Sequence, residues 1–513
     1  MQDEIEAFLG RTLNADAQAK RIETHSAVVF LSGDRALKIK RAIKLPFLDF
    51  STLEQRKAAC EAELAVNKPF APTIYRRVIP ITREGDGTLK IDGAGQPVEW
   101  ALDMARFDET ATLDRFAERD AIDAAMATAV ADAIANSHAK AAVSRTSAWV
   151  ESIPAIIQQN ADAFRTISAF APAESDRLER LSRSAYVKLS ALLARRNTEG
   201  FVRRCHGDLH LANVVLIDGK PVLFDAIEFD ENLATIDVMH DLAFTLMDLI
   251  RYGCDDAANT VLNRYLEDTA PDNLEALALL PLFVSLRAAV RANIFLYRSA
   301  QQGSDQSALD LARSYFTLAQ SALVPPPACV IAIGGLSGTG KTAAARLLAP
   351  LIGALPGAVV LRSDVLRKRM LGANELDRLP PSAYEPSVTA QVYAHLVAEA
   401  GRIARQGHSV IVDAVFAKED ERSAIEAVST QAAADFVGIF LTADLEVRLQ
   451  RIRRRSSDAS DATAAVAEAQ ERYDLASVGW TSVDAGGTPQ STADLCAALL
   501  PSTSLRRTDV RDG

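Results

Sequence analysis

Apolar and polar residues alternate in the first hundred residues with the two-residue period of β-strands. Two such runs, AVVFLS (residues 27–32) and RALKIK (residues 35–40), flank Gly33-Asp34, a pair typical of a tight hairpin turn. Residues 50–68 then follow a helical period. This order predicts short paired strands followed by a helix.

Helical spacing dominates the next two hundred residues. Residues 111–200 are rich in alanine, and long helical patterns return over residues 237–320. Between them, CHGDLHLANVVLIDGKPVLFD (residues 205–225) predicts a loop and two short strands around Gly219. The most apolar stretch, residues 276–297, contains Pro281, Arg287 and Arg291. We interpret it as a pair of core helices, because a spanning helix needs about 20 largely apolar residues.

A proline-rich seam, SALVPPPACVIAIGG (residues 321–335), ends this helical region. After it, apolar strand patterns at residues 329–335, 358–364, 409–416 and 436–443 alternate with helical ones. Such a pattern predicts an α/β domain whose parallel sheet is covered by helices on both faces. We therefore expect a first domain over residues 1–324, a linker at 325–328, a second domain over 329–500, and a polar tail at 501–513.

The composition indicates a soluble protein of two or three domains. The 513 residues carry a formal net charge of -11, which argues against wrapping of nucleic acid. The five cysteines form no C-x-x-C pair, and the acidic N-terminus lacks a signal-peptide run. These features predict reduced thiols, a cytoplasmic location and no membrane partner, and they leave the oligomeric state open.

The segment HGDLHLANVV contains candidate groups for phosphoryl transfer. Such a reaction requires a carboxylate that orients the acceptor and metal ions that neutralise the phosphates. Asp208 is suited to the first role. Asn213, five residues later, and Asp225, at the end of the strand PVLFD, are suited to metal coordination through oxygen atoms.

A nucleotide also needs a cation at its phosphates. Lys38 is our first candidate, with Glu63 of the following helix to fix it. Lys40 lies on the same face of its strand and remains an alternative to Lys38, while Glu61 remains an alternative to Glu63.

This constellation resembles the aminoglycoside phosphotransferase family over residues 20–300. The resemblance is carried by HGDLHLANVVL and LFDAIEFD. It implies a protein-kinase-like α+β fold, with a small β lobe and a large helical lobe. It further implies Asp208 as catalytic base, Asn213 and Asp225 as magnesium ligands, and residues 101–107, including Met104, as the adenine hinge. The phosphate-covering turn would fall at Thr24-His25-Ser26, where no glycine-rich loop exists.

A second phosphate-binding motif, GLSGTGKT, follows the strand pattern CVIAIGG and precedes a helical pattern. Its glycines let backbone amides turn toward phosphates, Lys341 can reach the outer phosphates, and Thr342 can hold magnesium. The predicted nucleotide-binding residues are Gly335, Ser337, Gly338, Thr339, Gly340, Lys341 and Thr342.

Charged residues downstream of this motif indicate a kinase. Asp364 follows a strand and could deprotonate an acceptor hydroxyl, while Arg367, one turn later, could bind an anionic group. Asp413 ends another strand and is a candidate magnesium-site acid that binds the ion through its direct ligands. Arg448, Arg451 and Arg455 share one helix face in VRLQRIRRRSSDASDA.

Residues 329–480 resemble small-molecule P-loop kinases related to zeta toxins and gluconate kinase. The resemblance implies Asp364 as base and Arg451 and Arg455 as residues of an arginine lid. The whole chain resembles bacterial fusions of an aminoglycoside phosphotransferase-like domain with an ATP-binding domain. We therefore expect a bifunctional kinase that uses ATP and Mg²⁺ on small-molecule acceptors. The alternatives are a nucleotide-binding regulator with one active domain, and a toxin-like kinase acting on a nucleotide sugar or a nucleic-acid end.

Overall fold

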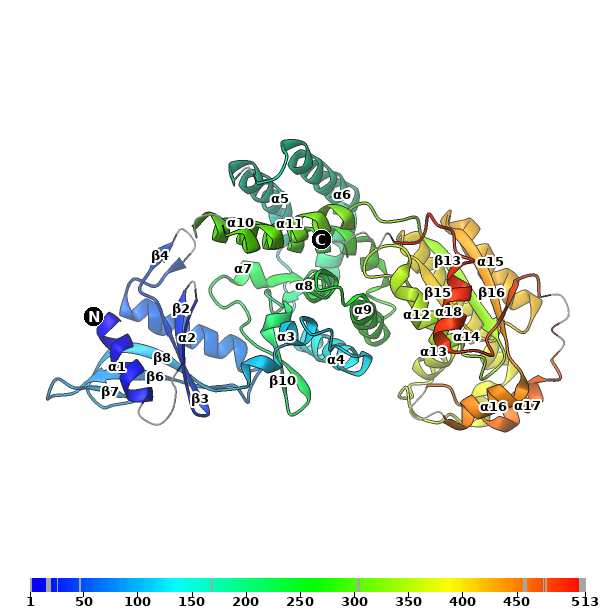
Figure 1. Ribbon diagram of the computed structural model, residues 1–513, viewed down its shortest axis with the longest axis horizontal. Coiled ribbons are helices and arrows are strands. Elements are labelled where there is room, and N and C mark those ends of the chain that lie inside the picture. The colour runs from blue at the N-terminus through cyan, green and yellow to red at the C-terminus, as the bar shows by residue number, and fades with distance from the viewer. Residues whose placement is uncertain are drawn as a thin grey trace. The chain divides into compact units, whose positions relative to one another are not determined.

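The computed structural model describes residues 2–14, 20–24, 26–45, 48–167, 169–301, 305–454, 459–473, 475 and 478–506. The chain forms two compact units (Figure 1). One unit contains residues 1–153 and 191–248, and the other contains residues 154–190 and 249–513. The predicted domain boundary near residue 325 lies within the second unit and stays a prediction.

The first unit opens with a six-stranded antiparallel sheet in the order β1-β2-β3-β8-β6-β7 (Figure 1, blue). The predicted hairpin is present, with Ser32 opposite Arg35 and Gly33 at a φ of 55°. Neighbouring residues of a strand point to opposite faces, so Phe30 packs in one cluster with Ile5 and Leu9 of helix α1, and Leu31 packs in another cluster with Ile74 and Leu102. The bounds are α1 Gln2–Asn14, β1 Lys20–Glu23, β2 Ala27–Ser32, β3 Arg35–Lys40, α2 Leu53–Asn67, β6 Tyr75–Arg83, β7 Leu89–Ile91 and β8 Gln96–Ala105.

The rest of the first unit is helical, with short hairpins between the helices. The predicted strands around Gly219 are β10 and β11, which pair antiparallel from Val214↔Leu223 to Ile217↔Lys220. Helix α8 is buried along nearly its whole length. The bounds are α3 Leu113–Ala117, α4 Ala124–Lys140, β9 Val202–Arg204, η2 Leu211–Asn213, β10 Val214–Ile217, β11 Lys220–Leu223, α7 Glu231–Ala234, β12 Thr235–Asp237 and α8 Val238–Arg251.

Five long helices open the second unit or connect to it: α5 Ala148–Ile167, α6 Pro172–Glu199, α9 Asp255–Thr269, α10 Leu280–Gln301 and α11 Gln306–Ala322. The predicted pair of helices over residues 276–297 is instead a short 3-10 turn, η3 (Leu274–Ala278), followed by the single helix α10. Pro281 lies in the first turn of α10, where its missing N–H costs nothing. Among the described residues, only Leu280–Ala300 is long and apolar enough to cross a membrane, and 61% of its most apolar window is buried.

The C-terminal part of the second unit is an α/β domain around a five-stranded parallel sheet, as predicted. The strand order is β14-β15-β13-β16-β17 (Figure 1, yellow-green to red). Helices α12 and α18 share one core with β13, β15, β16 and β17. The sequence patterns missed β17, because its four residues TSVD are mostly exposed and not apolar. The bounds are β13 Cys329–Gly335, α12 Lys341–Leu348, β14 Val359–Arg362, α13 Ser363–Met370, α14 Pro386–Arg405, β15 Val410–Asp413, α15 Glu419–Ala432, β16 Asp435–Thr442, α16 Leu445–Arg454, α17 Ala464–Gln470, β17 Thr481–Asp484 and α18 Pro489–Ala497.

Helix α9 covers the edge strand β14 of this sheet. The Asn263 side chain accepts a hydrogen bond from the Val360 N–H at 2.7 Å, and Asn259 donates to the Ala358 carbonyl at 3.0 Å. These bonds pair a backbone N–H and a backbone carbonyl that would otherwise lack a hydrogen-bond partner at the edge of the sheet. Leu505, in the predicted polar tail, forms an antiparallel β-bridge with Ile352. This part of the tail therefore packs against the second unit.

Candidate active sites

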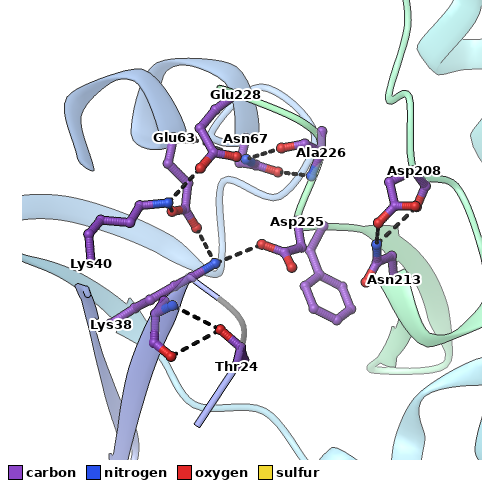
Figure 2. A network of polar contacts seen from close by, with 12 residues as sticks. Thr24, Lys38, Lys40, Glu63, Asn67, Asp208, Asn213, Asp225, Ala226 and Glu228 are labelled. Atoms are coloured by element: carbon purple, nitrogen blue, oxygen red, sulfur yellow. Dashed lines mark hydrogen bonds and ion pairs between the residues drawn. The ribbon is translucent and has the colours of Figure 1, made fainter. Parts of the chain in front are cut away.

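The loop between β9 and β10 places Asp208 and Asn213 side by side. The Asn213 amide donates to the Asp208 carbonyl at 2.9 Å and to its carboxylate at 3.2 Å (Figure 2). His210 lies 3.4 Å from the same carboxylate. Asn213 is buried, whereas the Asp208 side chain is 39% exposed and can meet a substrate from solvent.

Helix α8 holds this loop through three side chains on one face, Asp241, Thr245 and Asp248. Their spacing of four and three residues is that of a helix face, a signal by which all three could have been found from the sequence. The backbone groups bound are the N–H of His206 and Gly207, the carbonyl of Leu209 and the N–H of Leu211. The position of Asp208 is therefore set by the buried helix beneath it.

His206 has a structural role in this arrangement. Its ring lies 2.9 Å from the Phe224 carbonyl, and burial lowers the pKa of the imidazole. His138, Cys205 and Asp241 bring their ligand atoms within 4.8 Å of one another beneath the loop. Asp241 already accepts bonds from His138 and from two backbone amides, so this cluster braces the loop.

Lys38 of β3 reaches two carboxylates from distant parts of the first unit. Its ammonium lies 2.8 Å from Glu63 of α2 and 2.8 Å from Asp225 (Figure 2). Burial disfavours the charge, but the two carboxylates outweigh it and hold the pKa of Lys38 well above its usual value. Lys38 therefore remains a cation in the buried wall of the site.

The two alternative residues are engaged elsewhere. Lys40 is buried and lies 2.6 Å from the second oxygen of Glu63 and 2.5 Å from Glu228. Glu61 is exposed and faces Lys57 at 3.6 Å. Lys38, which Glu63 also contacts, is therefore the lysine that lies against Asp225.

The expected adenine hinge and phosphate-covering turn lie at opposite ends of this sheet region. Met104 is buried on β8, opposite Ala36 and Tyr75. A shallow hollow of about 450 Å³ follows β8, lined by Gly33 and residues 106–110. Thr24 closes the turn between β1 and β2 through hydrogen bonds with Ala27 (Figure 2). His25 lies outside the described residues.

The second motif forms a loop between β13 and α12. Gly335, Gly338 and Gly340 all have positive φ angles, of 138°, 88° and 96°. Lys341 folds back onto the loop, donating to the Gly335 carbonyl at 2.9 Å. Thr342 donates to the Asp413 carboxylate at 2.5 Å, which places two oxygen groups side by side at the start of α12.

Arg448 and Gln470 support this loop from outside. Arg448 is buried and donates to the Ser337 carbonyl at 3.0 Å, while the Ser337 N–H donates to Gln470 at 2.8 Å. A Cβ at Gly338 would lie 2.7 Å from the Arg448 carbonyl. Neither contact could be inferred from sequence spacing, because the residues lie more than a hundred positions apart.

A cavity of about 970 Å³ joins the loop to the other candidate residues. It is lined by Asp364, Arg367 and Asp413 together with the loop residues from Ser337 to Thr342. Burial raises the pKa of the Asp364 carboxyl, against the opposing effect of a hydrogen bond from Ser460. Arg367 is buried, donates to the Ala383 carbonyl at 2.7 Å and stacks on Tyr384.

The arginine cluster divides into three parts. Arg451 donates to the carbonyls of Thr339, Ala485 and Gly487, which binds it to the P-loop side of the cavity. Arg454 also lines the cavity, whereas Arg448 supports the loop. Arg455, the second predicted lid residue, lies outside the described residues.

Two family models match separate parts of the chain. Residues 90–280 match the phosphotransferase enzyme family, and residues 330–474 match an AAA domain family. These matches agree with the expected resemblances, to a phosphotransferase family in the first part of the chain and to a P-loop kinase-like domain in the second.

Two mycobacterial relatives align with most of the chain, and two solved structures align with smaller shares of it. Uncharacterized proteins of Mycobacterium tuberculosis and Mycobacterium bovis are 29% identical over 475 residues, covering 87% of this chain and 88% of theirs. An ethanolamine kinase of Plasmodium vivax is 12% identical, covering 60% of this chain and 84% of its own, with a TM-score of 0.37. A gluconokinase of Sinorhizobium meliloti is 19% identical, covering 34% and 90%, with a TM-score of 0.24.

Proposed function

We propose that this chain, in which a phosphotransferase-family domain is joined to a P-loop domain, is a bifunctional ATP-dependent kinase of small molecules. Each domain transfers the γ-phosphoryl group of ATP to a hydroxyl of a sugar-like or related metabolite. The protein acts in the cytoplasm, without a nucleic-acid or membrane partner. The supporting observation is that two separate sites each bring together carboxylates, a lysine and further side-chain oxygens of the kinds that phosphoryl transfer requires.

In the first site, Asp208 accepts the proton of the acceptor hydroxyl as its oxygen attacks the γ-phosphorus. The bond from the γ-phosphorus to the bridging oxygen breaks, and ADP leaves. Lys38 exchanges Asp225 for the phosphates. The oxygens of Asn213 and Asp225 suit Mg²⁺, and the Asp225 side chain is 45% exposed, so a hydrated ion can reach it. Bound Mg²⁺ would neutralise phosphate charge.

In the second site, Asp364 accepts the acceptor proton beside the P-loop. Lys341 leaves the Gly335 carbonyl for the outer phosphates, while the loop amides bind the inner ones. Thr342 and Asp413 form the oxygen set that suits a magnesium ion. Arg367 and Arg451 add positive charge to the cavity wall, where an anionic acceptor and the transferring phosphoryl group would lie.

The deciding experiment measures transfer of labelled γ-phosphoryl from ATP into fractionated metabolites. Wild type is compared with Asp208→Asn and Asp364→Asn, and labelled products are identified by mass. We expect each substitution to abolish a different product. Loss of every product in Asp364→Asn with none lost in Asp208→Asn would leave the first domain as a regulator. Absence of all products while nucleotide binds would refute small-molecule transfer.

A further inference from the structure

The segment of residues 225–228 begins with a residue in a conformation that needs outside support. Asp225 has a φ of 59°, in the left-handed region that residues other than glycine seldom adopt. Its N–H donates to the Tyr75 hydroxyl at 3.1 Å, which fixes one side of the residue. This backbone shape determines where the Asp225 carboxylate lies in the proposed site.

Asn67, the last residue of helix α2, forms two hydrogen bonds with Ala226, the next residue of the segment. Asn67 accepts from the Ala226 N–H at 2.7 Å and donates to the Ala226 carbonyl at 3.2 Å (Figure 2). Asn67 is fully buried, so water cannot replace either bond. A paired amide contact of this kind fixes both the position and the orientation of the peptide.

A second attachment lies at the end of the segment. The carboxylate of Glu228 lies 2.5 Å from the Lys40 ammonium, which also contacts Glu63 of α2 at 2.6 Å (Figure 2). Lys40 is 2% exposed and Glu63 is fully buried. Lys40 therefore links α2 to the segment without contacting Asp225 in the described structure.

We propose that Lys40 and Asn67 are positioning residues that lock the 225–228 segment to helix α2 before nucleotide binds. The proposal rests on the proposed function of the first site and explains why KIK carries two lysines. During the reaction Lys38 exchanges Asp225 for the phosphates. Lys40 meanwhile keeps the 225–228 segment, and with it Asp225, in position. The site is thus ordered for metal binding without a separate activation step.

Hydrogen exchange of the full-length, nucleotide-free protein tests the lock without requiring activity. Glu228→Gln keeps the side-chain shape but loses the charge that pairs with Lys40, and Asn67→Leu keeps a similar volume but loses both hydrogen bonds to Ala226. We expect the Ala226 amide to exchange about ten-fold faster in both variants. Glu231→Gln, the same chemical change on an exposed neighbour, should match wild type. Unchanged exchange in both variants would overturn the proposal.

Magnesium dependence then tests the link to the reaction. In Glu228→Gln the Mg²⁺ concentration for half-maximal first-site transfer should rise about ten-fold, with a smaller change in the KM for ATP at saturating Mg²⁺. Equal magnesium dependence in wild type and variant would contradict a positioning role. If wild type makes no product that depends on Asp208, the proposed function fails, and the exchange experiment still decides whether the lock exists.

Discussion

The Lys38 ammonium and the Asp225 carboxylate lie 2.8 Å apart although 187 positions separate them in the chain. Before nucleotide binds, the Lys38 ammonium thus occupies one carboxylate oxygen of Asp225, which is a predicted metal ligand. Nucleotide phosphates would draw Lys38 away and open Asp225 to magnesium. Binding of nucleotide and metal should therefore be coupled in the first site.

Replacing Lys38 by methionine should lower first-site transfer by about a hundred-fold, because a preorganised positive charge at the phosphates is lost. The measurement is the rate of the product that disappears in Asp208→Asn. Lys44→Met, on a side chain that is 74% exposed, serves as the control. Equal losses in both variants would mean that Lys38 does not act at the phosphates.

Gly338→Ala should abolish nucleotide binding at the second site. The added Cβ would meet the Arg448 carbonyl at 2.7 Å, so the loop must move. Gly372→Ala is a matched control, since Gly372 also has a positive φ, of 68°, but has no atom within 4 Å of its Cβ position. Both variants carry backbone strain of about 1 kcal/mol, and only the first carries the clash.

This prediction is measured by titrating each full-length variant with a fluorescent ATP analogue in a Lys38→Met background, which weakens the first site. A Gly338→Ala variant that binds as tightly as the Gly372→Ala control would show that the loop tolerates the displacement.

The second site should lose activity as the solution is acidified, at a higher pH than an ordinary aspartate would cause. Burial raises the pKa of Asp364, and a base works only when deprotonated, so activity falls as pH drops through that raised pKa. The hydrogen bond from Ser460 lowers the pKa. Ser460→Ala should therefore move the acid limb of kcat/KM to still higher pH.

The check is a pH profile of the product that depends on Asp364. Ser423→Ala, on an exposed residue of α15, should leave the profile in place. If the acid limb of kcat/KM stays at the same pH in Ser460→Ala, the loss of activity at low pH comes from protonation of a group other than Asp364.

The buried pair of Arg196 and Asp237 should dominate the stability of the first unit. Two nitrogens of Arg196 lie 2.7 and 2.9 Å from the Asp237 carboxylate, and both side chains are almost fully buried. Arg196→Met leaves that carboxylate uncompensated and should cost about 3–5 kcal/mol of unfolding free energy. Arg195→Met removes an exposed neighbour that pairs with Glu199 and should cost under about 1 kcal/mol.

Urea unfolding of the full-length variants, followed by intrinsic fluorescence, gives these free energies. Trp100 and Trp149 lie in the first unit and Trp480 in the second, so the fluorescence change includes the transition of the first unit. Similar midpoints for Arg196→Met and Arg195→Met would mean that the buried pair contributes no net stability.

Contiguous motifs were predictable because their chemistry is encoded by local spacing. The P-loop needs glycines, a lysine and a threonine within eight residues, and the loop from Asp208 to Asn213 spans six. The hairpin at Gly33 and four strands of the parallel sheet follow equally from local patterns. The sequence patterns did not predict strand β17, because a short, exposed edge strand needs no run of apolar residues.

By itself, then, the sequence determined the two folds, their order and the motifs that are predicted to bind phosphate. The tertiary structure alone decided that Lys38 faces Asp225 while Lys40 faces Glu228, since both lysines lie on one strand face and periodicity cannot separate them. It also decided that Asn67 meets Ala226, 159 positions away. Partners so distant are selected by closure of the whole fold, in which each buried polar group must find a hydrogen bond.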